Sequence, residues 1–294
     1  MSITTLLQLV FNGLAMGVLY ALGALGISLI WNASGLFNFA QGDLLTLGAY
    51  VMLSLFGKMN VPYIVAFALT FSVMGIVGYI LSRIYFYPML AARISPQIIL
   101  IATVAISIFI RNGILLVWGP HAQSFRNPFG ARALELGSLY IMPHVVGILA
   151  IVTVLLLALQ YFLRGTVVGI AMRAVAQRPV ASSLMGVRND HMVALTFFIS
   201  TGIAAIAGTL IAPILPLTPE MGGMIAIKAF AAVLIGGLGS FSGALLGGAA
   251  VGIAETFAAS VAPTYKDVFI FLVLVIFLVL RPGGVFRAQV SEKV

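Results

Sequence analysis

The sequence has no cysteine and very few charged residues. Among 294 residues there are 15 Lys and Arg and 7 Asp and Glu, so that 7% of the chain is charged. Without cysteine there can be no disulfide bridge, no thiolate nucleophile and no cysteine metal site. Since a soluble domain carries about 25% charged residues, this composition excludes a soluble fold of this length. It is typical of a polytopic membrane protein.

Apolar residues are correspondingly abundant. They make up 62% of the chain, and the mean hydropathy is +1.18. Inside a bilayer only helices and closed barrels satisfy the backbone hydrogen bonds, and each helical crossing needs about 20 apolar residues. The apolar runs are long and show no strand-like alternation. We therefore predict an all-α fold, a single transmembrane domain over residues 1–294.

We predict eight or nine spanning segments. Six are apolar runs near residues 6–30, 44–56, 62–85, 98–118, 143–163 and 192–215, and the last covers residues 268–280. Between them lies a glycine-broken stretch at 225–260, interpreted as two short helices around a turn or as one interrupted helix. Such discontinuous helices occur in transporters, where the freed backbone faces a cavity. The first run is rich in small residues, which predicts a central position in the bundle.

Basic residues indicate the orientation, because cytoplasmic loops carry an excess of Lys and Arg. Residues 1–8 contain neither, so we expect an uncharged lead into the first span, with the N-terminus outside, rather than a signal peptide. The inner side then holds Arg83, Arg93, Arg164, Arg173, Arg178, Arg188, Arg281, Arg287 and Lys293; the outer side and span ends hold Lys58, Arg111, Arg126, Arg132, Lys228 and Lys266. A C-terminus that is also inside requires nine crossings. The net charge of +8 is thus explained by topology and does not indicate a nucleic-acid partner.

The longest polar interruption is the central loop, residues 164–191. It is too polar to cross a bilayer, yet it has helix-forming residues on both sides of Pro179. Proline suits the first turn of a helix, and Gly186 can adopt the left-handed conformation that ends one. We predict short helices at the cytoplasmic membrane surface that contact a partner. The alternative is a solvated basic loop that only fixes topology.

Few polar residues fall within or beside the predicted spans. Asn38, Gln41 and Asp43 open the second span, where they can cap the helix N-terminus, line a permeation path, or do both. Glu255 lies in an apolar run, and an ionisable residue within a span is a functional candidate unless it sits near an interface. Arg111, in the outer part of the fourth span, either serves the path or extends to the membrane surface.

No catalytic constellation is present in the sequence. The three histidines, His121, His144 and His191, lie in loops or at span edges, without metal-ligand spacing and away from any intramembrane serine and acid. There is also no GxxxxGK[ST] phosphate-binding loop. We therefore expect no catalytic residue, cofactor or metal in this chain, and any ATP hydrolysis must take place on another chain.

Five stretches, taken in order, carry a family resemblance. They are residues 12–22, 37–42, 172–177 with 183–186, 228–244, and 265–267 with 281–286. Each is weak alone, but the ordered set covers nearly the whole chain. The sequence resembles the permease subunit of branched-chain amino-acid ABC importers, the Liv-type family.

Importer permeases carry a cytoplasmic signature that docks on the ATPase: Glu-Ala-Ala, then three residues of any kind, then Gly. The resemblance aligns it with residues 180–186, where Val180 replaces the Glu and Ser182 replaces the second Ala. It implies that the residues coupling the chain to an ATPase lie in the central loop; the candidates are Arg173, Gln177, Pro179, Ala181, Ser182 and Gly186.

The resemblance also implies a set of partners. The chain would be a multi-pass transport subunit of the bacterial inner membrane, paired with a second, related permease, in a heterodimer or a homodimer. Two cytoplasmic ATPase subunits would bind ATP and Mg²⁺, and a periplasmic or extracytoplasmic binding protein would select the solute. Branched-chain amino acids are the first candidates for the substrate, and urea, short amides and aromatic acids are alternatives. Two other classes remain open, an ion-coupled secondary transporter or channel and an intramembrane enzyme.

Overall fold

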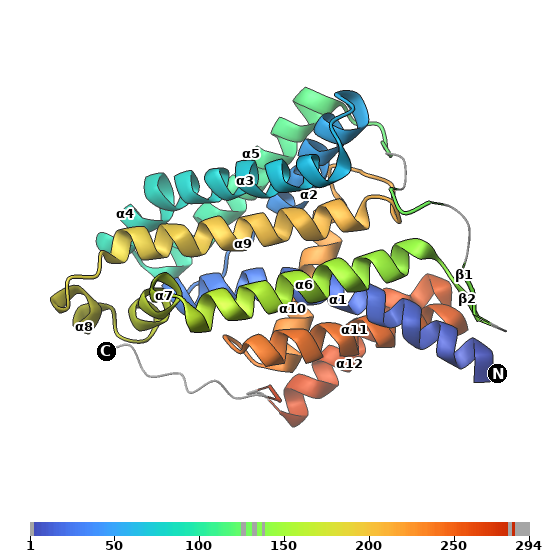
Figure 1. Ribbon diagram of the computed structural model, residues 1–294. Coiled ribbons are helices and arrows are strands. Elements are labelled where there is room, and N and C mark those ends of the chain that lie inside the picture. The colour runs from blue at the N-terminus through green and yellow to red at the C-terminus, as the bar shows by residue number, and fades with distance from the viewer. Residues whose placement is uncertain (1–2, 125–127, 131–133, 137–138, 282–283, 286–294) are drawn as a thin grey trace.

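Helices form nearly all of the described chain. The computed structural model describes residues 3–124, 128–130, 134–136, 139–281 and 284–285. Helices run side by side in a bundle (Figure 1), and one antiparallel hairpin, β1 (Leu134–Leu136) with β2 (Leu139–Ile141), lies near the start of the first helix. The predicted all-α membrane bundle is confirmed. Arg126, Arg132, Arg287 and Lys293 of the charge count lie outside the described residues, as do 282–283 and 286 of the last resembling stretch.

The elements follow one another as the apolar runs predict. The longer helices are α1 (Ile3–Ser34), α3 (Tyr63–Leu81), α5 (Pro96–Trp118), α6 (Pro143–Gly165), α9 (Asn189–Ile211), α10 (Met221–Gly236), α11 (Phe241–Val261) and α12 (Lys266–Leu280). The shorter ones are α2 (Gln41–Met52), α4 (Tyr87–Ala91), α7 (Val167–Gln177) and α8 (Pro179–Leu184). Two π-helical segments, η1 (Leu53–Lys58) and η2 (Ser82–Phe86), continue α2 and α3, and a 3₁₀ turn, η3 (Pro263–Tyr265), precedes α12.

Seven helical segments in the described part of the chain are long and apolar enough to cross a membrane. The two further segments expected are α2, which η1 continues to Lys58, and α10, which has only 16 residues. The glycine-broken stretch forms two helices around a turn, as one of the two interpretations predicted. Gly237 and Gly239 in that turn have φ of +104° and +78°, a region that favours glycine.

Two helices, α1 and α9, occupy the centre of the bundle. In the apolar 18-residue stretch of each helix, 83% of the residues are buried, whereas only 6% are buried in the segment that contains α12. Glycine allows α1 to touch α11 backbone to backbone, since a Cβ built on Gly252 would lie 2.2 Å from the amide nitrogen of Gly17. Small residues permit this close approach in membranes. The predicted central position of the first span is therefore confirmed.

Helices α2 and α10 both begin inside the bundle, and their N-termini meet. Ala40, just before α2, is 1% exposed, and Met221, at the start of α10, is 9% exposed. A Cβ built on Gly222 would lie 2.0 Å from the carbonyl oxygen of Gly42, so the two first turns are in backbone contact. A helix N-terminus has unpaired N–H groups and positive partial charge. The fold thus brings two such ends together in its interior.

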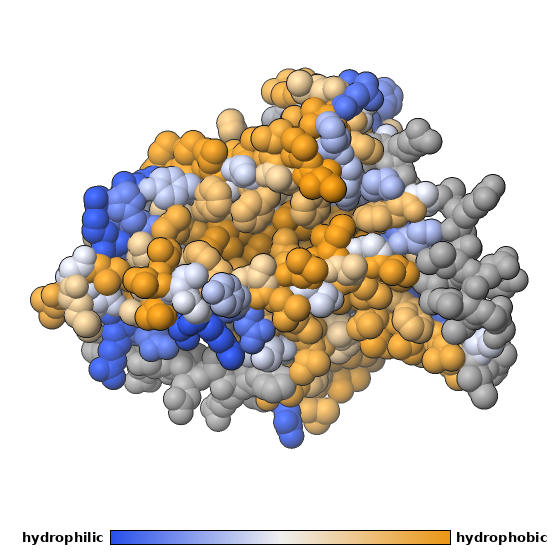
Figure 2. Space-filling view, in the orientation of Figure 1, coloured by the Kyte–Doolittle hydropathy of each residue, from blue (hydrophilic) through white to orange (hydrophobic). Residues whose placement is uncertain are grey.

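The surface separates into an apolar middle and polar ends. Figure 2 shows hydrophobic residues across the middle of the molecule and hydrophilic residues gathered at the end that carries α7 and α8. That end lies opposite the start of α1 (Figure 1). The arrangement fits a multi-pass membrane protein whose central loop projects from one face of the bilayer.

Candidate functional site

The polar residues predicted at the start of the second span lie together in the interior. Asn38, Gln41 and Asp43 are 6%, 3% and 2% exposed. The Oδ1 atom of Asn38 accepts a hydrogen bond of 3.1 Å from the N–H of Ala40, the residue that precedes α2. Asn38 therefore holds the turn that leads into the helix, which is close to the capping role considered from the sequence.

Gln41 joins α2 to the centre of α9. Its Nε2 atom donates to the hydroxyl and the carbonyl oxygen of Ser200, at 3.1 and 3.3 Å. Its Oε1 atom is buried and accepts no hydrogen bond from any described residue. An unpaired buried acceptor is costly, so this oxygen is available to a donor that enters the site.

Asp43 connects α2 to α5. Its carboxylate accepts a hydrogen bond from Ser107 and forms an ion pair with Arg111, whose Nε atom lies 3.3 Å from Oδ1. Asp43 is almost fully buried, whereas 37% of the Arg111 side chain is exposed. Arg111 also approaches α10, since a Cβ built on Gly223 would lie 3.7 Å from its Nη2 atom. We call Asn38, Gln41, Asp43, Ser107 and Arg111 the α2 cluster.

Glu255 belongs to a different group of residues. Its Oε1 atom lies 2.5 Å from the Nζ atom of Lys228 and 3.6 Å from that of Lys266, and its Oε2 atom accepts a 2.6 Å hydrogen bond from the Tyr20 hydroxyl. Lys228 also lies 2.9 Å from Asp267. This ionic cluster joins α1, α10, α11 and α12. Of the five predicted path residues, the structure pairs Asp43 with Arg111 and places Asn38 and Gln41 near them at the start of α2 with partners of their own. The fifth, Glu255, lies elsewhere.

Lys228 also lies within a predicted apolar segment, the glycine-broken stretch at 225–260. It was counted among the basic residues of the outer side, but it is buried within α10 and paired with two carboxylates. A buried, paired lysine does not report topology through the loops. The rule that marks an ionisable residue within a span as a functional candidate applies to Lys228 as well as to Glu255.

The central loop folds as two short helices, as its composition predicts. Helix α7 begins after Thr166, whose hydroxyl accepts a 3.0 Å hydrogen bond from the Gly169 N–H, and α8 begins at Pro179. Gly186 has φ of +84°, the left-handed conformation expected of it. The last turn of α8 therefore ends where the sequence indicated.

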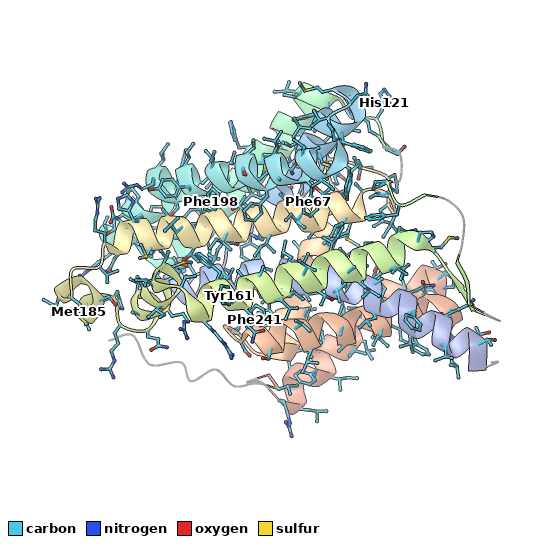
Figure 3. All side chains as sticks on the ribbon, in the orientation of Figure 1. Phe67, His121, Tyr161, Met185, Phe198 and Phe241 are labelled. Atoms are coloured by element: carbon cyan, nitrogen blue, oxygen red, sulfur yellow. The ribbon has the colours of Figure 1, made fainter. Side chains whose placement is uncertain are left out.

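The predicted coupling residues lie at the end of the molecule that carries α7 and α8. Arg173, Gln177, Pro179, Ala181 and Gly186 are exposed, whereas Ser182 is buried and its hydroxyl donates to the Arg178 carbonyl oxygen at 2.9 Å. Three large apolar residues beside them are also exposed: Val180 by 72%, Leu184 by 84% and Met185 by 84%. Met185 stands at the tip of the loop (Figure 3). These three side chains are therefore free to contact a partner.

Ion pairs fix the junction between the central loop and α9. The Asp190 carboxylate lies 2.6 Å from the guanidinium of Arg83 on η2 and 3.3 Å from that of Arg188. The Tyr79 hydroxyl lies 2.9 Å from Nδ1 of His191. Among the described residues, no group of three or more His, Asp or Glu side chains could hold a metal ion.

Comparison with known proteins settles the family. The sequence profile described as "Branched-chain amino acid transport system / permease component" matches residues 9–278. The chain belongs to this family. The branched-chain amino acid permease protein BraD of Pseudomonas aeruginosa is 32% identical over 98% of both chains. The permease protein LivH of Escherichia coli K12 is 31% identical over 98% of this chain and 97% of its own length.

A third relative is less similar. It is a probable LivH permease protein of Methanocaldococcus jannaschii, 29% identical over 91% of this chain and 88% of its own length. Among solved structures, PsaBC of Streptococcus pneumoniae in complex with a Fab is similar, with a TM-score of 0.50 and 10% identity over 92% of this chain and 89% of that chain. At that identity the likeness concerns the fold alone. The family resemblance drawn from the five ordered stretches is confirmed.

Proposed function

We propose that this permease moves branched-chain amino acids into the cytoplasm as part of an ABC importer. It would pair with a second, related permease and with two ATPase subunits that bind ATP and Mg²⁺, and it would receive the solute from an extracytoplasmic binding protein. The observation that carries this proposal is the similarity to branched-chain amino acid permeases over 98% of the chain. Reconstitution tests it: ATPase subunits should co-purify, and a loaded binding protein should stimulate hydrolysis. Uptake into liposomes by this chain alone would instead indicate a secondary transporter.

The proposed orientation has the N-terminus outside and the central loop in the cytoplasm. The four arginines of the loop, Arg164, Arg173, Arg178 and Arg188, support it, as does the position of α7 and α8 opposite the start of α1. Because the chain has no cysteine, single cysteines report topology directly. We expect Gln177→Cys to be protected from an impermeant thiol reagent in intact cells and Met59→Cys, in an exposed turn, to be labelled. Labelling of Gln177→Cys from outside would contradict the docking role.

Helix α8 and its apolar tip are the proposed docking surface for an ATPase. Val180 occupies the position of the signature Glu, so the contact made here is apolar where that of the signature is charged. The exposed side chains of Val180, Leu184 and Met185 support this contact. A short helix that ends at a left-handed glycine can enter a cleft on the partner as a rigid unit.

Substitution of Gly186 should disturb that unit without crowding it. No atom lies within 4 Å of a Cβ built at this position, so the only cost is its φ of +84°. For a β-branched residue this conformation costs about 1–2 kcal/mol. We expect Gly186→Val to insert normally but to retain several-fold less ATPase on co-purification. Gly186→Asn is the matched control, since asparagine tolerates this region, and equal loss in both variants would contradict the argument.

The α2 cluster is the proposed part of the translocation path. A zwitterionic solute needs polar partners in the bilayer, because each polar group buried without one costs several kcal/mol. Asn38, Gln41 and Asp43 lie at two converging helix N-termini, which suit a carboxylate. Arg111 uses its Nε atom for Asp43, and no other hydrogen bond of its side chain is found among the described residues. Its remaining N–H groups can attract the carboxylate of the solute.

Variants of Arg111 test this role. Loss of a hydrogen bond to a charged group costs about 1.5–3 kcal/mol, so Arg111→Gln should lower uptake per folded permease about tenfold or more. Uptake is divided by the membrane level of each variant, because Arg111→Gln also leaves the buried Asp43 carboxylate without its cation. Arg111→Lys keeps the charge and should retain more uptake than Arg111→Gln. Asn112→Ala is the control, because Asn112 is exposed and bonds only to its own helix, at the Ile108 carbonyl oxygen. Full uptake in both Arg111 variants would leave a surface anchor as its only role.

A further inference from the structure

Helix α9 begins where the docking surface ends. The Asn189 side chain donates a 2.8 Å hydrogen bond to the carbonyl oxygen of Pro179, the first residue of α8. The Val187 N–H donates to the Ser182 carbonyl oxygen at 3.1 Å. The first bond ties the N-terminus of α8 to the first residue of α9, and the second closes the turn between the two helices. A displacement of α8 is therefore carried into the first turn of α9.

Further along, α9 is in backbone contact with α2. A Cβ built on Gly48 would lie 2.4 Å from the Cα of Ala205, and one built on Gly208 would lie 2.2 Å from the carbonyl oxygen of Leu45. Close-packed surfaces of this kind transmit displacement, because they leave no free volume to absorb it. Helix α9 is also one continuous helix of 23 residues. Movement of α9 would therefore displace α2 with it.

Ser200 lies midway along α9 and contacts both neighbouring helices. Its hydroxyl donates a 2.8 Å hydrogen bond to the Gly26 carbonyl oxygen of α1 and accepts one of 3.1 Å from Nε2 of Gln41. Ser200 is fully buried. Gly26 leaves room for this arrangement, since a Cβ there would lie 2.5 Å from the Gln41 nitrogen. The Gln41 side chain is thereby held by α9 rather than by its own helix.

We propose that α9 transmits movement of the docking helix to the start of α2, and that Ser200 is the positioning residue through which it sets the Gln41 side chain. The inference rests on the proposed function and adds the route by which the ATPase acts on the path. Such coupling requires an element with two arrangements that both sites bias. The proposed element is α9 together with α2, which connect α8 to the α2 cluster.

The test compares two hydroxyls of α9 in the reconstituted importer. Ser200→Ala removes the bonds to Gly26 and Gln41. Thr196→Val is the matched control, because the Thr196 hydroxyl is buried in the same helix but donates only to its own backbone, at the Met192 carbonyl oxygen. We expect Ser200→Ala to keep its membrane level, its ATPase subunits and its stimulated hydrolysis, but to lose about fivefold in solute moved per ATP. Thr196→Val should match the wild type.

A double-mutant cycle with Gln41→Ala provides the second measurement. If Ser200 acts through Gln41, the double variant should transport about as well as Gln41→Ala alone, and additive losses would overturn the proposal. Parallel loss of yield, hydrolysis and uptake in Ser200→Ala would also overturn it, since that pattern indicates a purely structural role. Equal transport per ATP in Ser200→Ala and Thr196→Val would do the same. Failure of the wild-type chain to bind an ATPase would refute the proposed function itself.

Discussion

Replacing Lys228 with methionine is expected to destabilise the permease more than any other single change of charge. Lys228 pairs with both Glu255 and Asp267, and the side chains of Lys228 and Glu255 are 9% and 8% exposed. Removing one partner of a buried ion pair costs about 3–5 kcal/mol, because the other charge is left uncompensated. We expect a sharp fall in folded protein in the membrane and in the unfolding temperature of the purified chain in detergent.

Two further variants distinguish the loss of the ion pair from the loss of one positive charge. Lys58→Met removes an equal charge from an exposed position at the end of η1, where Lys58 forms no ion pair with the described residues, and it should be neutral. Lys228→Met combined with Glu255→Met should recover much of the loss, since apolar replacement of both partners is often tolerated, and Lys266 remains beside Asp267 in the chain. A double variant no more stable than Lys228→Met would show that the pair is not the source of the effect.

Replacing Gly222 with valine is expected to abolish folding or transport. The new Cβ would lie 2.0 Å from the Gly42 carbonyl oxygen and 2.2 Å from the Thr46 hydroxyl. Backbone cannot move aside as a flexible side chain can, so α2 and α10 would have to separate. Overpacking in a core typically costs about 1–3 kcal/mol, and a clash with backbone lies at the upper end. Membrane level and uptake would both report it.

The neighbouring glycine is the control for that prediction. A Cβ built on Gly223 meets only the Nη2 atom of Arg111, at an ordinary contact distance of 3.7 Å. Gly223→Ala should therefore fold and assemble like the wild type. Equal damage from Gly223→Ala and Gly222→Ala would indicate that helix propensity or flexibility, and not the contact between α2 and α10, requires glycine here.

Much of the fold could be predicted because each long apolar run is one helix. The run near 98–118 became α5, at Pro96–Trp118, and the glycine-broken stretch became α10 and α11. Length and hydropathy decide such elements locally. The left-handed Gly186 was predictable for the same reason, since a proline and a glycine bracket a short helix.

The candidate sites were predictable only in part, because their partners are far apart in the sequence. Asp43 was identified from its position before an apolar run, but its neighbour Ser107 is one serine among many and carries no local signal. Ser200 is equally inconspicuous within α9, although it bonds Gly26 and Gln41. Which polar residues meet depends on how the helices pack, and one sequence contains no direct record of that.

The position of Lys228 also constrains how the chain enters the membrane as it is synthesised. Helix α10 has 16 residues, fewer than the about 20 that a crossing needs, and it contains a lysine whose partner, Glu255, emerges from the ribosome 27 residues later. On its own, α10 would place an unpaired ammonium in the lipid, at a cost of about 2.5–3.5 kcal/mol. Helix α10 should therefore wait at the translocon until α11 arrives, and the two should leave it together as a hairpin with the ion pair already formed.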